Sequence, residues 1–360
     1  MGATLVHVLL LAFTALSTAV AISLPNIFLS KDTVVSRGLV YHYLYAPANP
    51  SKPTLLFCHG FPSSARDWTH VAFALQAQGY GVLIPDMLGY GGTAKPTDPA
   101  AYVPSLISKD IIDILDAEQL GTVVAVGHDW GSKVISRVAN YFPERVSAYA
   151  FFAVPYQSVV PPPNFKAELQ QQREQYGYEL YGYWLFMSAP DANDVMQEHI
   201  DSFVSVLFPK DPAIWKTRFA PTGAFRKSLV ENYRAPLPSW MSEADKKYVV
   251  DFYRRGGFEA PTSWYKIMAS GLSETDDEQI PSERKFPPAS APIYFGAAKQ
   301  DYICLVEIGY QAFEDDGFRN HNVTIKEYGG DHWLIISEAD EIVRDLEEWL
   351  EGVVAPAVGY

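Results

Sequence analysis

The chain has 360 residues, of which 48% are hydrophobic and 14% aromatic, so it contains ample material for a buried core and is not an intrinsically disordered protein. Acidic residues outnumber basic residues by 42 to 28, which gives a formal net charge of −14. This balance argues against a nucleic acid as partner, because phosphate binding requires clustered basic residues and the sequence contains no basic cluster.

The first predicted element is an apolar segment, residues 1–21, that ends in the letters AVA. A small–x–small ending after an apolar run is typical of a signal-peptide cleavage site, so we expect a secreted protein that is cleaved after Ala21. The alternative is a retained membrane anchor, for which the run is barely long enough. A glycosylation acceptor triplet at Asn322 fits the secretory route.

Short β-rich runs then alternate with helical patterns. Such alternation predicts a mostly parallel sheet with helices on both faces. Near the C-terminus, Ser337 with Asp340 three residues later predicts a capped final helix. Strands are expected over 39–45, 54–58, 81–84, 122–126, 146–154, 292–296 and 323–328, and helices over 67–78 and 105–120.

The alternation stops between about residues 155 and 290. This part of the chain has a helical, aromatic-rich pattern, and we interpret its last residues, SETDDEQIPSERKFPPASAP, as a polar, proline-rich connector. The sequence therefore predicts one α/β domain in two parts, residues 22–154 and 291–360, with a helical lid over 155–290.

The letters VGHDWGS after the fourth predicted strand place Asp129 between two glycines. A glycine two residues to either side is what a sharp strand–turn–helix elbow requires, and such an elbow raises its central side chain above the sheet. A carboxylate there attacks an sp³ carbon to give an ester that water can hydrolyse, whereas a serine would remain as an ether. The elbow therefore indicates attack on an alkyl carbon bearing a leaving group.

Hydrolysis of such an ester needs a general base and oxyanion donors. Of the eight histidines, His332 alone follows a C-terminal strand, and Asp301 follows the strand before it, so these two are the candidate base and its orienting acid. The backbone N–H groups of Trp130 and Phe61 are the candidate oxyanion donors. The Phe61-Pro62 bond, in a tight turn, is a candidate for the cis form.

Five motifs carry a resemblance to a known family: CHGFPSS, PDMLGYGGTAKP, VGHDWGS, the aspartate of KQDYI, and GGDHW. In this order, and over nearly the whole mature chain, they resemble the epoxide hydrolases of the α/β-hydrolase fold. The resemblance implies that fold, with a helical cap between the two halves of the core, and a hydrolase that uses no cofactor and no metal ion. It implies a small hydrophobic epoxide and water as the reacting partners.

The resemblance also assigns residues. It implies Asp129 as the nucleophile, Asp301 and His332 as the water-activating pair, and Phe61 and Trp130 as oxyanion donors. Two lid tyrosines that protonate the epoxide oxygen match Tyr183, in YGYWLF, and Tyr265, in TSWYKI. Tyr178 and Tyr181 remain rivals of Tyr183, and Phe61, Trp130 and Trp264 are expected to contact the substrate in an apolar cavity.

Two other functions compete with epoxide hydrolysis. A haloalkane or haloacid dehalogenase uses the same nucleophile and base but needs no acid for its leaving halide. The HGFP motif and the tyrosine pair together disfavour it. A non-catalytic ligand-binding protein on the same scaffold is the second alternative, and it is disfavoured because no catalytic residue is missing. The two cysteines, Cys58 and Cys304, are expected to be separate thiols.

Overall fold

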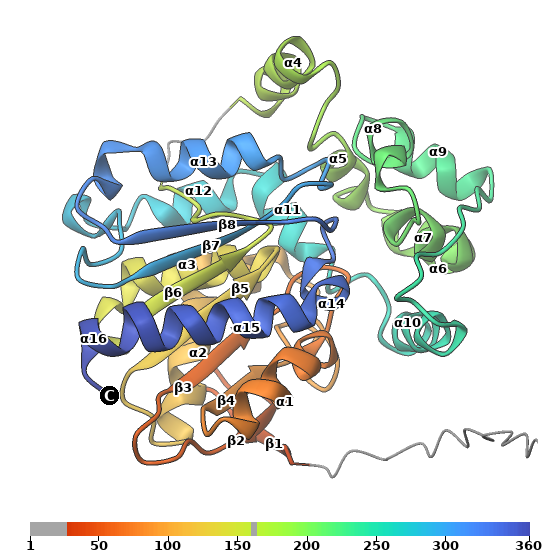
Figure 1. Ribbon diagram of the computed structural model, residues 1–360. Coiled ribbons are helices and arrows are strands. Elements are labelled where there is room, and N and C mark those ends of the chain that lie inside the picture. Colours follow the sequence, from red (N-terminus) through yellow and green to blue (C-terminus); the bar gives the residue numbers. More distant parts are fainter. Residues whose placement is uncertain (1–26, 160–163) are drawn as a thin grey trace, which may run out of the picture.

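A computed structural model describes residues 27–159 and 164–360 of the protein (Figure 1). The predicted signal segment, residues 1–21, lies outside the described residues. No helix in the described ranges is long and apolar enough to cross a bilayer.

The centre of the fold is an eight-stranded sheet with the order β1-β2-β4-β3-β5-β6-β7-β8. Strands β3 to β8 pair in parallel, and only the pairs of β2 with β1 and with β4 are antiparallel. The strands are β1 (Leu29–Val34), β2 (Val40–Ala46), β3 (Thr54–Cys58), β4 (Gly81–Pro85), β5 (Val123–His128), β6 (Val146–Phe152), β7 (Ile293–Ala298) and β8 (Val323–Tyr328).

Both faces of this sheet are covered by helices. Along β3, Leu55 and Phe57 pack into the core on the face covered by α1 and α15, whereas Leu56 and Cys58 pack into the core on the opposite face, with α2 and α3. This alternation explains why the central strands are continuous apolar runs in the sequence. The helices outside the β6–β7 segment are α1 (Thr69–Ala77), α2 (Pro104–Ala117), α3 (Trp130–Tyr141), α13 (Val306–Glu314), α14 (Leu334–Ser337), α15 (Ala339–Trp349) and α16 (Ala355–Val358).

Between β6 and β7 the described chain is helical and contributes no strand. Helices α5 to α10 gather at one side of the sheet (Figure 1), whereas α12 runs back to contact α2. The helices are α4 (Phe165–Tyr176), α5 (Tyr183–Met187), α6 (Ala192–Glu198), α7 (Ile200–Leu207), α8 (Trp215–Arg218), α9 (Ala224–Val230), α10 (Glu243–Gly256), α11 (Ser263–Ala269) and α12 (Leu272–Asp277).

Shorter turns of helix complete the described structure. They are the 3₁₀ segments η1 (Ala65–Trp68), η2 (Pro99–Tyr102), η3 (Pro143–Arg145), η4 (Pro212–Ile214), η5 (Ser282–Arg284) and η6 (Asp316–Phe318), and the π-helical segment η7 (Leu350–Val354).

Each predicted strand is present within two residues of its expected bounds, and the sheet is mostly parallel, as predicted. Three expectations need correction. Strand β1 was not predicted. The predicted N-cap of the final helix is wrong. Ser337 is the last residue of α14, and Glu338 occupies the N-cap position of α15 without a capping hydrogen bond from its side chain. The prediction of a polar connector is wrong at its start, because Glu274, Asp276 and Asp277 belong to helix α12 and are buried.

Candidate active site

Asp129 lies at the sharp turn between β5 and α3, and its backbone is strained, with φ +54° and ψ −124°. Positive φ is rare for a residue with a side chain and is typical of functional sites held by the surrounding fold. The flanking glycines make the turn possible. A Cβ on Gly127 would lie 2.6 Å from the Gly131 carbonyl oxygen, and one on Gly131 would lie 2.0 Å from the Cys58 carbonyl oxygen.

The two oxygens of the Asp129 carboxylate have different surroundings. Oδ1 accepts a hydrogen bond of 2.7 Å from the Phe61 N–H, and Oδ2 lies 3.6 Å from His332 Nε2. Burial raises the pKa of Asp129, but the nearby charge of His332 and the hydrogen bond from the Phe61 N–H outweigh it and hold the pKa below its usual value. Asp129 is therefore an ionised carboxylate with one oxygen held and the other facing the imidazole.

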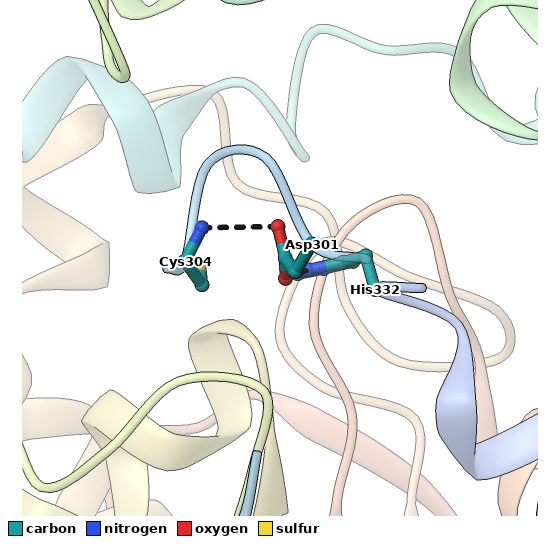
Figure 2. Close-up of side chains that lie close together, drawn as sticks. All are labelled: Asp301, Cys304 and His332. Carbon is teal, nitrogen blue, oxygen red and sulfur yellow. Dashed lines mark hydrogen bonds and ion pairs between the residues drawn. The ribbon is translucent and has the colours of Figure 1, made fainter. Parts of the chain in front are cut away.

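Strands β7 and β8 run parallel to β5, so the residues after them meet at the same edge of the sheet. His332 Nδ1 lies 2.6 Å from Asp301 Oδ2, and the other oxygen of Asp301 accepts the N–H groups of Ile303 at 2.9 Å and Cys304 at 3.0 Å (Figure 2). Burial lowers the pKa of His332, but Asp301 and Asp129 outweigh it and hold this pKa well above 6.5. The imidazole is thus a cation between two carboxylates.

Cys304 is the third side chain of this cluster (Figure 2). Asp301, Cys304 and His332 offer ligand atoms within 4.8 Å of one another, a spacing that a metal ion can use. However, both oxygens of Asp301 already accept hydrogen bonds, one from His332. Burial also raises the pKa of the Cys304 thiol to about 12, whereas a metal binds the thiolate. The present contacts suit acid–base chemistry better than metal binding.

The other histidines near this edge have structural partners. His128 Nε2 lies 2.7 Å from the carbonyl oxygen of His332, and burial lowers its pKa to about 4. His59 Nδ1 bonds to the Gly60 carbonyl at 2.9 Å, and its Nε2 accepts the Met87 N–H at 3.0 Å. His59 and His128 therefore have structural hydrogen bonds, and His332 is the histidine whose ring nitrogen faces the Asp129 carboxylate.

Tyr183 and Tyr265 lie together on the side of the helical segment. Their ring centroids are 5.8 Å apart, and the Tyr265 ring packs edge-on against Trp130 at 5.1 Å. Both are buried. Burial, reinforced by the negative charge of Asp129, raises the pKa of each phenol well above 10. Two protonated phenols therefore lie near Asp129.

The rivals of Tyr183 differ from each other. Tyr178 donates a hydrogen bond of 2.8 Å to the carbonyl oxygen of Tyr302, so its hydroxyl is already used. Tyr181 stacks on Trp184 at 5.0 Å and lines the same cavity as Tyr183. The hydroxyl of Tyr178 is therefore not free to donate into the cavity, whereas Tyr181 remains an alternative to Tyr183.

A cavity of about 420 Å³ extends from Asp129 between the core and the helices α4, α5, α11 and α12. Trp130, predicted to contact the substrate, is among its lining residues, but Phe61 and Trp264 are not. The Trp264 ring lies behind Trp130 at 6.2 Å, and its indole N–H donates to the Leu88 carbonyl at 3.0 Å. Trp264 therefore packs against Trp130 and does not line the cavity itself.

The remaining predicted features near the site are also located. The Phe61-Pro62 bond is cis and both cysteines are free thiols, as predicted. Trp130 is the first residue of α3, so its N–H has no carbonyl partner within the helix and is available to an oxyanion. Asp331, which precedes His332, accepts a hydrogen bond of 2.9 Å from the Trp333 N–H and is partly buried, and this burial raises its pKa to about 6.

Comparison with known proteins agrees with this geometry. Residues 53–243, more than half of the chain, match the family model described as alpha/beta hydrolase fold. The chain belongs to the α/β-hydrolase-fold family.

Several relatives of this α/β hydrolase carry the same functional name. It is 28% identical to epoxide hydrolase A of Mycobacterium tuberculosis over 84% of this chain and 92% of that one. It is 27% identical to an epoxide hydrolase of Neurospora crassa over 89% and 94% of the two chains. Among solved structures, an epoxide hydrolase from an endophytic Streptomyces superposes with a TM-score of 0.74 at 24% identity, over 91% of this chain and 96% of that chain. At this identity the superposition supports the fold alone.

Sequence reasoning missed two groups in this α/β hydrolase. Cys304 lies beside His332, and its proximity to Asp301 in the chain was the available signal. Lys133 and Glu274 line the same cavity as Asp129. Lys133 follows the nucleophile by one helical turn, which was a signal, whereas Glu274 lies in the stretch interpreted as a connector.

Proposed function

We propose that this α/β hydrolase is an epoxide hydrolase. The observation that carries the proposal is the position of two buried, protonated tyrosines, Tyr183 and Tyr265, near a carboxylate nucleophile that also faces a His–Asp pair. An epoxide oxygen leaves as an alkoxide and needs an acid, and the phenols supply one. The names of the relatives from Mycobacterium tuberculosis and Neurospora crassa support the same conclusion.

In the first step, Asp129 Oδ2 attacks an epoxide carbon and the C–O bond of the ring breaks. Because Oδ1 is held by the Phe61 N–H, the carboxylate presents Oδ2 to the substrate in a fixed orientation. The ring oxygen takes a proton from Tyr183 or Tyr265. Their raised pKa values keep these phenols protonated at neutral pH, so they remain available as acids.

In the second step, His332 activates water to hydrolyse the ester. The resting imidazole is protonated because two carboxylates face it, and esterification removes the charge of one of them. The pKa of His332 therefore falls when the ester forms, and its proton passes to the phenolate left on Tyr183 or Tyr265, which leaves a neutral imidazole. This imidazole takes one proton from the attacking water. The substrate oxygen leaves the tetrahedral intermediate with the other water proton, so Asp129 returns as a carboxylate. The N–H groups of Phe61 and Trp130 stabilise the oxyanion, and a vicinal diol is released.

The substrate assay separates this function from its alternatives. With styrene oxide we expect formation of the corresponding diol, and with a haloalkane of similar size we expect no halide release. Halide release without diol formation identifies a dehalogenase. Saturable binding of both compounds without turnover identifies a ligand-binding protein.

The lining of the cavity indicates the reacting partners. We infer a small, largely hydrophobic epoxide and water as partners, since Trp130, Trp184 and Phe165 line the cavity beside Asp129.

We also infer that the protein is a secreted glycoprotein, cleaved after Ala21 and carrying a glycan at Asn322. The letters of residues 1–21 and the exposed position of Asn322 support this inference.

A further inference from the structure

The cavity that contains Asp129 has a charged region in its wall. Besides its aromatic residues, it is lined by a lysine from α3 and by carboxylate side chains from α4 and α12. Lys133 follows Asp129 by four residues, which is a rise of about 6 Å along α3. The charged region therefore lies about one helical turn from Asp129 in the wall of the same cavity, where a substituent on an epoxide bound at Asp129 can reach it. Its titratable residues are Lys133, Glu168, Glu274 and Asp277.

Lys133 is only 8% exposed, and its hydrogen-bonding capacity is not filled. Among the described residues its ammonium group has one hydrogen-bond partner, Asp277 Oδ2 at 3.2 Å, although an ammonium group has three donors. Asp277 does not need Lys133 as a hydrogen-bond donor, because Arg137 donates to both of its oxygens at 2.6 Å. Burial and the charge of Arg137 lower the pKa of Lys133 to about 8. At neutral pH the lysine is a cation with donors to spare.

Glu274 lacks, among the described residues, a hydrogen-bond donor for one of its carboxylate oxygens. Its side chain is buried, with 6% of the residue exposed, and its Oε2 has no hydrogen-bond partner in the described part of the chain. A buried carboxylate oxygen without a donor costs free energy, so natural proteins rarely leave one without a reason. Glu274 accordingly needs a hydrogen-bond donor that the described residues do not supply, next to a lysine that needs an acceptor.

A neutral hydroxyl group satisfies both residues, because it donates one hydrogen bond and accepts another. A carboxylate substituent would face Glu274, Glu168 and Asp277, which repel it. An ammonium substituent could donate to Glu274, but Lys133 would repel it and it cannot accept a hydrogen bond from Lys133, so it would satisfy only one of the two residues. The residues of the wall therefore select a neutral group with both donor and acceptor character.

We propose that Lys133 and Glu274 form a polar subsite that binds a hydroxyl group on the chain of the substrate, several carbon atoms from the epoxide ring. This inference rests on the proposed epoxide hydrolase function and refines its substrate class. The preferred substrate is an epoxide with an apolar chain and a distant hydroxyl, rather than a pure hydrocarbon epoxide.

The test compares three terminal epoxides of equal chain length with the wild-type protein. One ends in a methyl group, one in a hydroxyl group and one in a carboxylate. We expect kcat/KM for the hydroxyl compound to exceed that for the methyl compound by about tenfold, which is the factor from one hydrogen bond to a charged group. Equal values for these two compounds, or the highest value for the carboxylate, would overturn the subsite. Absence of diol formation from all three contradicts the proposed function and this inference with it.

A variant pair then assigns the preference to Glu274. In Glu274→Gln, the ratio of kcat/KM between the hydroxyl and methyl compounds is expected to fall several-fold, and a ratio taken within one variant is independent of how much protein is folded. The matched control is Glu278→Gln, one turn later and exposed, in which the ratio should stay at the wild-type value. An unchanged ratio in Glu274→Gln, or the same fall in Glu278→Gln, contradicts the assignment.

Discussion

At the scale of single residues, Asp129 combines a strained backbone with a carboxylate whose two oxygens have separate partners. The left-handed φ raises the side chain above the sheet edge, and the Phe61 N–H fixes one oxygen. His332 is near enough to the other oxygen to stabilise its charge, yet at 3.6 Å it leaves that oxygen without a hydrogen bond of ordinary length. This arrangement keeps the attacking oxygen ionised and available.

The two tyrosines give the first prediction. Tyr183→Phe and Tyr265→Phe should each lower kcat by about a hundredfold or more, because each removes a donor to the developing alkoxide. Steady-state kinetics on one epoxide measures the effect. Tyr178→Phe is the control, since its hydroxyl bonds to the Tyr302 carbonyl, and it should change kcat little. A large loss in Tyr178→Phe together with a small loss in Tyr183→Phe would reverse the assignment.

The imidazole of His332 gives a prediction about pH and stability. Its folded-state pKa lies well above its unfolded value of about 6.5, so the protonated form stabilises the fold fully below pH ~6.5. This stabilisation is lost as the pH rises through the folded pKa. The pKa of Asp129 is shifted downward, so its contribution is present above pH ~4 and lost below. The ion pair therefore stabilises most between these two values.

Denaturant titrations from pH ~6 to pH ~9 measure this effect. Relative to His332→Gln, the wild-type protein should lose stability as the pH rises over this range. A control variant, His70→Gln, changes an exposed histidine on the surface and should follow the wild-type profile. Parallel profiles for the wild type and His332→Gln would show that the imidazole is not a stabilised cation.

Single residues also show how far the sequence predicts the site. Asp129, Asp301 and His332 follow strands β5, β7 and β8, and the ends of parallel strands meet at one edge, so their proximity was predictable. Glu274 was not, because an acidic stretch in a polar segment is ordinarily solvated. Its burial depends on how α12 packs against the core, and that packing has no local signal in the sequence.

At the scale of elements, α12 is attached to the core by buried charges. Arg137 on α3 is fully buried, donates to both oxygens of Asp277, and also donates to the Gln157 carbonyl at 2.5 Å. Asp276 accepts the N–H and the hydroxyl of Ser105 at 2.7 and 2.6 Å. These contacts connect the loop that leaves β6, the return of the helical segment and the two core helices α2 and α3.

This attachment gives the third prediction. Arg137→Met should lower the free energy of unfolding by about 3–5 kcal/mol, because it leaves the buried Asp277 without its main partner. Equilibrium denaturation measures the change. Arg319→Met is the matched control, since Arg319 and Asp316 are 72% and 88% exposed, and it should cost less than about 1 kcal/mol. Similar costs for the two variants would contradict the role of the buried pair.

Two elements show why sequence patterns failed in places. Strand β1 has the residues LSKDTV, and most of its side chains are exposed or half-exposed, so it lacks the apolar run that marks the central strands. Ser337 was expected to cap the last helix, but its own N–H already bonds to the Trp333 carbonyl at 3.0 Å. A residue inside a helical turn cannot adopt the extended backbone that an N-cap uses.

At the scale of the whole molecule, the parallel sheet and the helical segment have separate tasks. The sheet edge holds Asp129 and the His332–Asp301 pair, and helices α4, α5, α11 and α12 close a cavity around Asp129. The mostly parallel sheet and the positions of Asp129, Asp301 and His332 after its strands were predictable from alternating apolar runs. The composition of the cavity wall was not, because it depends on contacts between residues distant in the chain.

The secretory route is a prediction at this scale. Asn322 is exposed immediately before β8, so an oligosaccharide can be attached there without disturbing the sheet. Expression of the full chain in a eukaryotic secretory host should place the protein in the medium with a glycan on Asn322. Glycosidase treatment and mass spectrometry measure this, and Asn322→Gln should lack the glycan. Retention of unmodified protein inside the cell contradicts the predicted route.

The proposed mechanism passes through a covalent alkyl ester on Asp129, and this ester can be trapped and detected directly. His332→Gln lacks the base of the second step, so incubation with an epoxide should leave an adduct of the epoxide's mass on the peptide containing Asp129, as seen by mass spectrometry. We expect this adduct in His332→Gln and no diol formation by Asp129→Ala. An Asp129 peptide without adduct, together with normal turnover in Asp129→Ala, would contradict it.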